Sequence, residues 1–397
     1  MDRLSGETKL LFLLERTDKY MIKIVAFIFD LSHGGAQGVL VNVCNYLNSL
    51  ENVMVEVVVQ NLDNPVYKKE LDTNIQVTSF EVSSARKMLK PLKKYLNRNE
   101  FDYAFAFSPE IAVNLVLARK STKKNFKIVG RCINTLSIEF KHTKSFFRKY
   151  ITNNLIKRYY SYVDIAVAQS QGMASDLEKN FNFNEKQIMV INNAMNPLFE
   201  AEARETEKKN LKDNYILYVG RLEQQKGLTF LLDSFRMLED KDVMLYLVGN
   251  GSQREMLNEL SVQYGINERV KFVEYTRDVM EYYKRAKITV LSSYFEGFPN
   301  VLVESIACGT PVVSFDLPSG PSEIIIIGKN GYLVDYLDSQ QLAKKIDEAL
   351  INKWDESVIK NTSMRYSKDN IMSKYRNLFM YNDKCLLENE EIKSSEE

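Results

Sequence analysis

The chain has 397 residues, of which 45% are hydrophobic and 26% are charged; this is typical of a soluble globular protein with room for two domains. The formal net charge of +1 gives no overall tendency to bind polyanions. No apolar run is long enough to span a membrane. The cysteines lie far apart in no paired spacing, which indicates reduced thiols rather than disulfides or a zinc site; they are Cys44, Cys132, Cys308 and Cys385.

Residues 1–20 contain an apolar patch that is too short, and too closely flanked by acidic residues, to be a signal peptide. We expect an extension that is not part of the fold. A buried strand is predicted over residues 21–29, and a helix with apolar residues at helical spacing over residues 37–50. Between them lie Gly34 and Gly35, a pair that lets the backbone approach a ligand closely in front of a helix N-terminus.

Further strands alternate with helical segments through the first half of the chain. This alternation predicts a parallel sheet that is covered by helices on both faces, as in α/β proteins. The strands are expected at residues 55–59, 103–107, 127–129, 163–168 and 188–191.

Two stretches in this half are strongly basic: one runs from Arg86 to Arg98, and the other from Lys141 to Tyr160. Each has six Lys or Arg residues and no acidic residue, with apolar and aromatic residues in between. Such a pattern is typical of a surface that docks on an anionic membrane or on nucleic acid. The alternative is a solvated helix face whose apolar side packs on the core. We favour peripheral membrane contact, because both stretches fall in one half and no nucleic-acid-binding motif accompanies them.

Residues 197–214 are polar and rich in charge, which marks a domain boundary. After it the alternation of strands and helices resumes, so we expect a second α/β domain. Its strands are expected at residues 215–219, 243–248, 270–272, 288–291 and 312–315.

These patterns divide the chain into six predicted parts. They are an extension at 1–20, an N-terminal domain at 21–200, a linker at 201–214, a C-terminal domain at 215–370, a helix at 371–386 and a disordered acidic tail at 387–397.

The loop after the strand at residues 215–219 carries Arg221 and Lys226 and leads into a predicted helix. Arginine offers a planar fork to phosphate oxygens, lysine a point charge, and the helix N-terminus a positive dipole end. The alternative is a pair of exposed basic residues without a ligand. Glycines also follow the first two strands of the predicted C-terminal domain, namely Gly220, Gly249 and Gly251. In an open parallel sheet, the loops after the strands lie at the carboxyl ends of the strands, where ligands bind.

Residues 292–315 are expected to form a loop broken by glycine, a short helix and then an apolar strand. Pro299 is expected in the first turn of a short helix, and Gly309 just past its end. Glu296 then lies in the loop before the helix, and Glu304 within it. A helix start is an anion site, and two carboxylates beside it suggest a ligand with both phosphate and hydroxyl groups. The alternative is a βαβ unit whose acidic residue stabilises the helix.

Several segments form an ordered set: GGAQGVLVNVCNYL, VDIAVAQSQGMASDL, VINNAMN, YVGRLEQQKGL, LVGNGSQREML, EGFPNVLVESIACGTPVVSFDLPSGPSEII and NGYLV. Together they resemble the retaining glycosyltransferases of family 4, which have the GT-B fold. The resemblance covers residues 21–375 and includes the E-x7-E spacing of Glu296 and Glu304. It implies two Rossmann-like domains facing a central cleft, with the C-terminal helix returning toward the N-terminal domain.

The resemblance implies a role for four charged side chains. Arg221 and Lys226 would hold the diphosphate of a nucleotide-sugar donor, Glu304 would bind the ribose hydroxyls, and Glu296 would face the donor sugar. Two cations and a helix N-terminus can stabilise the charge that grows on a nucleoside diphosphate as it leaves. We therefore expect Glu296, Arg221 and Lys226 to be the catalytic residues.

The resemblance also implies that the backbone contacts the donor. Backbone groups of Phe298, Asn300 and Val301 would meet the distal phosphate, and the loop of Gly34 and Gly35 would lie near the reacting centre. The glycines of the C-terminal domain would belong to the donor site as well, namely Gly220, Gly249 and Gly251.

One segment departs from the family pattern. Many members have a histidine near the donor sugar, where this chain has Arg131, Cys132 and Asn134, with Cys132 at the histidine position. The two histidines of the chain, His33 and His142, do not fit that place. Retaining transfer does not require such a base if the leaving phosphate takes the acceptor proton. Activity is therefore still expected, although the sugar contact at Cys132 is not.

These observations predict a hexosyltransferase that moves a sugar with retention from UDP-hexose or UDP-N-acetylhexosamine to a polyprenyl-diphosphate-linked saccharide. It would serve bacterial polysaccharide assembly, such as O-antigen or capsule, in the cytoplasm at the inner membrane face. No cofactor is expected. No metal is expected either, because Asp240-Lys241-Asp242, the one Asp-x-Asp candidate, lies in a polar turn. The alternatives are a soluble or protein acceptor, or a two-domain ligand-binding protein, which normally needs a secretion signal.

Overall fold

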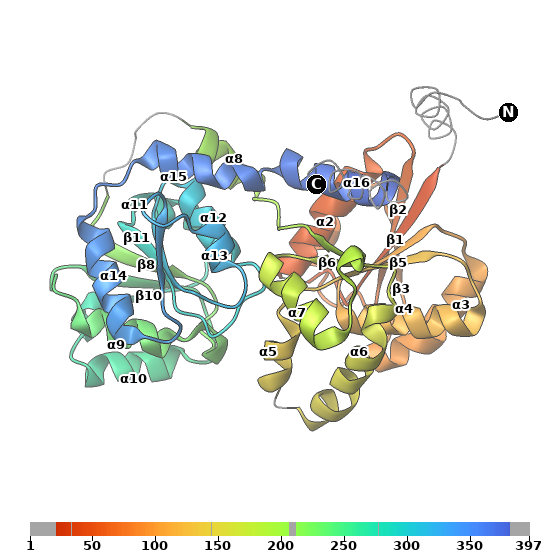
Figure 1. The fold of residues 1–397 in the computed structure, drawn as a ribbon, viewed down its shortest axis with the longest axis horizontal. Coiled ribbons are helices and arrows are strands. Elements are labelled where there is room, and N and C mark those ends of the chain that lie inside the picture. Colours follow the sequence, from red (N-terminus) through yellow and green to blue (C-terminus); the bar gives the residue numbers. More distant parts are fainter. Residues whose placement is uncertain (1–20, 33, 144, 206–211, 277, 382–397) are drawn as a thin grey trace, which may run out of the picture.

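The computed structural model describes residues 21–32, 34–143, 145–205, 212–276 and 278–381. The predicted extension at 1–20 and acidic tail at 387–397 lie outside the described residues. The described chain forms two α/β domains side by side, and the last helix reaches back from the second domain to the first (Figure 1).

The N-terminal domain is built on a seven-stranded parallel sheet with the strand order β3-β2-β1-β4-β5-β6-β7. Alternate residues of the inner strand β1 pack into the apolar clusters on opposite faces of the sheet. Val25 and Phe27 belong to one cluster, and Ile24 and Ala26 belong to the other. Both faces of the sheet are therefore buried, which explains the continuous apolar runs of its strands. The strands are β1 Ile22–Ile28, β2 Val53–Val59, β3 Gln76–Ser79, β4 Tyr103–Ala106, β5 Lys127–Arg131, β6 Ile165–Ala168 and β7 Ile188–Val190.

Helices cover both faces of this sheet. Polar caps define several helix starts; for example, Ser108 accepts from the backbone N–H of Ile111 ahead of Pro109 in α4. Residues 148–152 form a short π-helical segment, η3, that leads into α6. The helices are α2 Gly35–Asn48, α3 Leu89–Arg98, α4 Pro109–Thr122, α5 Leu136–Lys141, α6 Asn153–Tyr159 and α7 Gln171–Phe181.

The C-terminal domain repeats this architecture with a six-stranded parallel sheet in the order β10-β9-β8-β11-β12-β13. In each sheet the strand order reverses at the first strand: β1 lies between β2 and β4, and β8 lies between β9 and β11. In open parallel sheets, ligands bind at such a switch point, in a crevice at the carboxyl ends of the strands. The strands are β8 Tyr215–Val219, β9 Met244–Val248, β10 Val270–Val273, β11 Ile288–Leu291, β12 Val312–Phe315 and β13 Gly331–Val334. The helices are α9 Leu228–Met237, α10 Arg254–Gln263, α11 Val279–Arg285, α12 Asn300–Ala307, α13 Pro321–Ile324, α14 Ser339–Ile351 and α15 Glu356–Ser363.

The boundary between the domains lies earlier than the sequence indicated. Residues 197–204, divided above between the N-terminal domain and the linker, form helix α8 Pro197–Arg204. This helix packs on α12 and α15, and its Phe199 belongs to an apolar cluster of the C-terminal domain. The Asn196 side chain caps α8 ahead of Pro197. The charge-rich composition of the segment obscured this start signal.

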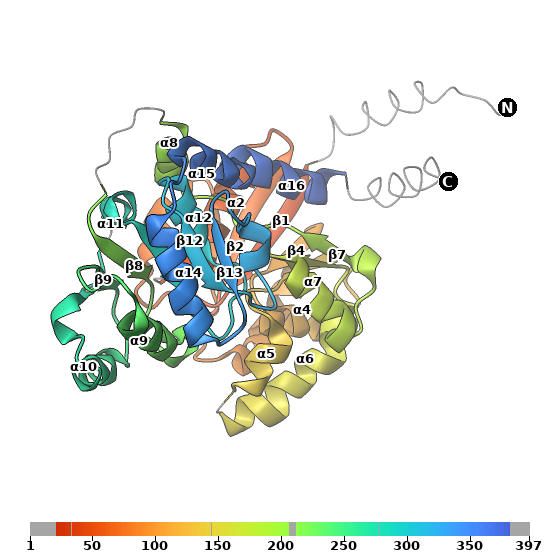
Figure 2. The same cartoon turned by 60° about the vertical axis from the view of Figure 1, so that its left-hand side comes forward.

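The C-terminal helix α16 Lys368–Met380 returns to the N-terminal domain as predicted, although it starts before residue 371. Figures 1 and 2 both show it beside α2. The face that packs there is apolar, and its burial stabilises the contact between the first and last described helices. The buried residues are Ile371, Met372, Tyr375, Leu378 and Phe379.

Candidate active site

Lys226 and Glu296, two predicted catalytic residues, contact each other at the carboxyl end of the C-terminal sheet. Lys226 Nζ lies 2.7 Å from Glu296 Oε1, and Ser293 Oγ donates to the same oxygen at 2.6 Å. Glu296 is 8% exposed, so these partners take the place of water around its carboxylate oxygens. A donor diphosphate bound by Lys226 would compete with this carboxylate for the ammonium group.

The pair meets because the loops after β8 and β11 pack closely. Gly227 has φ +58°, and a Cβ there would lie 2.2 Å from the carbonyl oxygen of Ser292. Gln225 Nε2 also donates to the carbonyl of Phe295 at 2.9 Å. Arg221, in contrast, is exposed, and among the described residues its side chain has one long hydrogen bond, 3.5 Å to Gln225 Oε1. Its guanidinium can therefore turn toward a ligand without breaking a strong interaction.

The predicted donor-site glycines have a packing role in addition to any ligand role. Gly249 has φ +142°, and a Cβ there would lie 2.0 Å from the carbonyl oxygen of Gly220. A Cβ on Gly251 would lie 2.3 Å from the carbonyl oxygen of Leu222. The loops after β8 and β9 thus touch backbone to backbone, which would explain these glycines even without a ligand.

Helix α12 begins at Asn300, directly after the loop that follows β11 and contains Glu296. Pro299 precedes the helix instead of lying in its first turn. Among the described residues, no side chain caps the helix start and no acidic residue lies in the first turn. The Leu302 N–H donates to the Pro299 carbonyl at 3.0 Å, which leaves the N–H groups of Asn300 and Val301 to an anion. The ring of Phe298 packs against Tyr366 in the core, with centroids 5.2 Å apart. The side chain of Phe298 is therefore occupied in the core, and only its backbone remains for the predicted ligand contact; Val301 is half-buried.

Glu304, one turn into α12, is oriented by a residue that the sequence analysis did not identify. The Tyr283 hydroxyl on α11 donates to Glu304 Oε2 at 3.0 Å. Burial raises the pKa of Glu304, and the bond from Tyr283 offsets part of this by stabilising the carboxylate. The bond from Tyr283 thus favours the ionised form of this carboxyl group. No sequence pattern around Tyr283 distinguishes it from a core tyrosine.

Arg131, at the end of β5, is 1% exposed and connects the domains. Its Nη2 donates to Asn193 Oδ1 at 2.5 Å, and Asn193 Nδ2 donates to Asn300 Oδ1 at 2.9 Å. The guanidinium also lies 5.6 Å from the ring centroid of Phe107. Within the part of the chain that the structure describes, no carboxylate forms an ion pair with Arg131, and its Nε has no hydrogen-bond partner. The Asn193 bridge was missed, although VINNAMN places polar residues just after a strand.

Cys132 and Asn134 lie in the following turn. Cys132 Sγ donates to the carbonyl of Asn134 at 3.1 Å, and the side chain belongs to the apolar cluster of the N-terminal domain. Burial raises the pKa of the thiol, which is therefore neutral and unsuited to act as a base. The Asn134 amide contacts Glu139 at 3.3 Å. A Cβ on Gly297 would lie 3.3 Å from the Asn134 Cα, so the backbone of this turn lies against the Glu296 loop.

The predicted glycine pair lies at the carboxyl end of the central strand β1. Gly34 precedes helix α2 and Gly35 is its first residue. A Cβ on Gly35 would meet no atom within 4 Å, so the space beside this helix start is open. The neighbouring Asp30 accepts from Ser32 and Gln37; burial raises the pKa of Asp30, but these bonds outweigh it and hold the pKa below its ordinary value.

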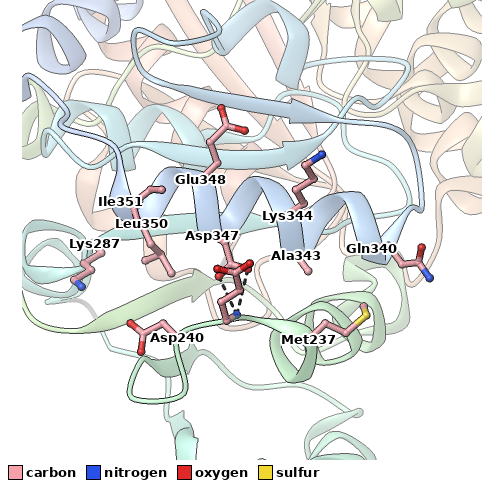
Figure 3. Close-up of a pocket in the computed structure, with 11 residues that line it drawn as sticks. Met237, Asp240, Lys287, Gln340, Ala343, Lys344, Asp347, Glu348, Leu350 and Ile351 are labelled. Atoms are coloured by element: carbon pink, nitrogen blue, oxygen red, sulfur yellow. Dashed lines mark hydrogen bonds between the residues drawn. The ribbon is translucent and has the colours of Figure 1, made fainter.

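A hollow with a volume of about 660 Å³ lies elsewhere, between α9 and α14 (Figure 3). Lys287 and Asp240, which line it, precede β11 and β9, so the hollow opens at the amino ends of the strands, away from Lys226. Asp240 accepts from the Asp242 backbone N–H at 2.8 Å, which closes the turn of the predicted Asp-x-Asp. We assign this hollow no part in a transfer reaction.

The two basic stretches differ in what their apolar residues do. In the first, Met88, Leu92 and Leu96 are fully buried, as the solvated-face alternative expects. In the second, Phe146 is 76% exposed and Tyr150 53% exposed, with ring centroids 4.6 Å apart. Ile151 and Leu155 are also exposed, and we call Phe146, Tyr150, Ile151 and Leu155 the outer apolar patch.

The two stretches meet where the Arg86 guanidinium lies 4.1 Å from the ring centroid of Phe147. Figures 1 and 2 place α6 at the end of the N-terminal domain opposite α16. Among the described residues, no helix combines the length and apolar character needed to cross a bilayer.

Two Rossmann-like domains that face each other define the GT-B fold class, and solved structures share this fold. The galactosyltransferase WaaB of the lipopolysaccharide outer core aligns over 90% of this chain and 98% of its own, with a TM-score of 0.71 and 22% identity. HepE of Anabaena, in complex with UDP-glucose, aligns over 90% and 99%, with a TM-score of 0.70 and 20% identity.

Family models identify the particular group. Residues 33–197 match the model described as Glycosyltransferase Family 4, and residues 199–368 match the one described as Glycosyl transferases group 1. The chain belongs to the family 4 glycosyltransferases. One relative, from Campylobacter jejuni, is N-acetylgalactosamine-N,N'-diacetylbacillosaminyl-diphospho-undecaprenol 4-alpha-N-acetylgalactosaminyltransferase. It is 28% identical over 324 residues, which are 79% of this chain and 86% of the relative.

Proposed function

We propose that this glycosyltransferase moves a hexose or N-acetylhexosamine from a UDP-linked donor, with retention, to a lipid-linked saccharide. The observation that carries the proposal is the Lys226–Glu296 pair, 2.7 Å apart in front of the start of α12, which has no side-chain cap among the described residues. A cation, a carboxylate and the N–H groups of a helix start together suit a diphosphate and the sugar attached to it. A UDP donor is supported by HepE, which shares the fold and was solved with UDP-glucose.

In the proposed reaction, the bond between the sugar and the donor phosphate breaks as the acceptor oxygen forms its bond on the same face. The departing phosphate oxygen takes the proton of the acceptor hydroxyl, so no side-chain base is needed. Lys226, Arg221 and the start of α12 stabilise the charge that develops on the leaving diphosphate. Glu296 faces the sugar, and Glu304 accepts from the ribose hydroxyls. We expect no metal requirement, since these positive groups already face the diphosphate.

The acceptor assignment has two supports. The Campylobacter relative is named for a diphospho-undecaprenol substrate, and the outer apolar patch is flanked by the exposed cations of Lys149, Lys157 and Arg158. Exposed aromatic residues among lysines and arginines are suited to the headgroup region of an anionic membrane. We therefore propose peripheral contact with the inner face of the cell membrane, where the acceptor lipid would be collected for polysaccharide assembly.

The test is a panel of nucleotide sugars assayed for release of the nucleoside diphosphate. A short polyprenyl-diphosphate saccharide serves as acceptor in one arm, and a water-soluble glycan in the other. We expect turnover with one or more UDP-sugars, a product with the donor's anomeric configuration, and no loss of rate with a chelator. Preference for the soluble glycan would replace the acceptor assignment. No turnover with any donor and either acceptor would contradict the proposal.

A further inference from the structure

Thr135 is positioned to cap helix α5, yet its side chain makes no cap bond there. Its hydroxyl instead reaches the other domain, where Thr135 Oγ1 lies 2.7 Å from Ser319 Oγ and 3.3 Å from the carbonyl oxygen of Glu296. The two hydroxyl residues are 3% and 2% exposed. The helix thus gives up a stabilising cap for a buried contact across the domain interface.

Both hydroxyls reach the backbone of Glu296. Ser319 Oγ donates to the Glu296 carbonyl oxygen at 2.7 Å, and Thr135 Oγ1 lies 3.3 Å from the same oxygen. A serine hydroxyl has one proton to donate, so while Ser319 donates to Glu296, the proton of the bond between the two hydroxyls comes from Thr135. In that arrangement the chain runs from Thr135 through Ser319 to the backbone of Glu296.

Ser319 is itself held rigidly against the N-terminal domain. A Cβ on Gly172, at the start of α7, would lie 2.1 Å from the carbonyl oxygen of Pro318. The Gly172 backbone N–H also donates to Glu323 Oε1 at 3.2 Å. The segment around Ser319 therefore lies in direct backbone contact with the start of α7.

The segment around α5 touches the Glu296 loop at two further points. The His142 ring stacks on Phe295, with centroids 5.2 Å apart and an interplanar angle of 25°. A Cβ on Gly297 would lie 2.4 Å from the carbonyl oxygen of Ile133. The residues on both sides of Glu296 are therefore packed against this segment of the N-terminal domain.

Glu296 is consequently fixed from both domains. Its carboxylate is held by Lys226 and Ser293 within the C-terminal domain. Its backbone is held by Ser319, and through it by Thr135 of the N-terminal domain. Beyond α5 the chain continues into the outer apolar patch, so the same segment joins the proposed acceptor side to the loop that faces the sugar.

We propose that Thr135 and Ser319 are positioning residues, whose hydroxyl chain sets Glu296 for the transfer step when the domains close. This rests on the proposed function, because it assumes that Glu296 faces the donor sugar. The chain contacts the backbone of Glu296 and not its carboxylate or Lys226. Its loss therefore changes turnover and leaves nucleotide binding largely intact.

The test is a set of three variants of the full chain, with UDP as the binding probe and the best UDP-sugar as donor. Thr135→Val preserves the shape and removes the hydroxyl, and Ser319→Ala breaks the next bond. Thr135→Ser retains the hydroxyl and should restore activity. Loss of one buried hydrogen bond to a reacting residue predicts a kcat about tenfold lower in the first two variants. The UDP Kd should change by less than about twofold, since no group that binds the diphosphate is altered.

The matched control is Thr122→Val, whose hydroxyl donates to the backbone of its own helix; its kcat should be unchanged. Normal kcat in both Thr135→Val and Ser319→Ala overturns the inference. It is also overturned if kcat, UDP affinity and melting temperature fall together, or if Thr135→Ser is as slow as Thr135→Val. If Thr135→Val does not fold, Ser319→Ala and Thr135→Ser still decide. Absence of turnover in the wild-type protein would instead contradict the proposed function, because every comparison here needs an active parent.

Discussion

The two sides of the domain interface hold their polar groups in different ways. On the donor side, Lys226 and Glu296 come from two loops of one sheet and contact each other directly. On the N-terminal side, Arg131 makes its polar contact with Asn193, which continues to Asn300 in the other domain, and Thr135 contacts Ser319. The donor side can thus be assembled when one domain folds, whereas the N-terminal side is completed only when the domains meet.

This difference suggests a division of labour. A nucleotide donor could bind to Lys226 and Arg221, because both cations belong to the C-terminal domain. Closure against the N-terminal domain would then fix the backbone of Glu296 and the start of α12 through contacts that span both domains. Binding should therefore depend on residues of one domain, and turnover on residues of both.

The largest expected effect separates the two glutamates. Glu296→Gln should lower kcat about a hundredfold, because a charge facing the reacting sugar is lost. UDP binding should not weaken, since Lys226 is released from its internal partner. Glu304→Gln should instead weaken UDP binding about tenfold, with a nearly normal kcat at saturating donor.

Steady-state kinetics and UDP calorimetry on the same preparations check this, with the exposed Glu281→Gln as control. A normal kcat in Glu296→Gln, together with inactive Glu304→Gln at saturating donor, would reverse the two assignments.

A smaller effect is expected from breaking the bridge between the domains. Asn193→Ala removes the one hydrogen-bond partner found for the buried Arg131 guanidinium among the described residues. A buried polar group left without a partner costs about 1–3 kcal/mol, so urea unfolding should show a loss of this size. Asn193→Asp should restore stability by pairing with the arginine. Unchanged stability in Asn193→Ala would mean that the bridge does not hold the domains together.

The smallest effect concerns the membrane, where each cation contributes at most about 1 kcal/mol and salt screens it further. Reversal of Lys149, Lys157 and Arg158 to Glu should release the protein from anionic liposomes and slow transfer to a lipid-linked acceptor. Transfer to a water-soluble acceptor should persist. Arg148 is left intact because it forms ion pairs with Glu110 and Glu139.

The matched control for the membrane reverses Lys90, Lys93 and Lys94 on α3, whose apolar residues are buried. This variant should sediment with liposomes more than the variant in which Lys149, Lys157 and Arg158 are reversed. If the wild-type protein stays in the supernatant at low salt, with and without anionic lipid, the outer apolar patch does not bind membranes.

The difference between contacts within one domain and contacts between the domains also explains how much could be predicted from the sequence. The strand, loop and helix around Glu296 were predicted because their signals are local: a buried apolar run, a proline at the helix start and a glycine after its end. Arg221 and Lys226 were identified for the same reason, since both lie within one loop after a strand.

Contacts between distant residues left no such signal. Thr135 looks like a helix cap, and Ser319 like an ordinary loop serine, until folding brings them together. Asn193 lay within a recognised segment, but no pattern indicated its partners. The start of α8 was obscured because charged residues, which suggested a linker, lie on the exposed side of a helix whose Phe199 is buried.

The most direct test of the account is the binding of UDP to the wild-type protein and to Lys226→Ala, measured by calorimetry. Loss of a charge-assisted bond worth about 1.5–3 kcal/mol should weaken UDP binding roughly ten- to a hundredfold, and Arg221→Ala should weaken it in the same direction. Arg236→Ala, a control on α9 in the same domain, should bind UDP normally. Equal UDP affinity in the wild-type protein, Lys226→Ala and Arg221→Ala would contradict the placement of the donor diphosphate at this site.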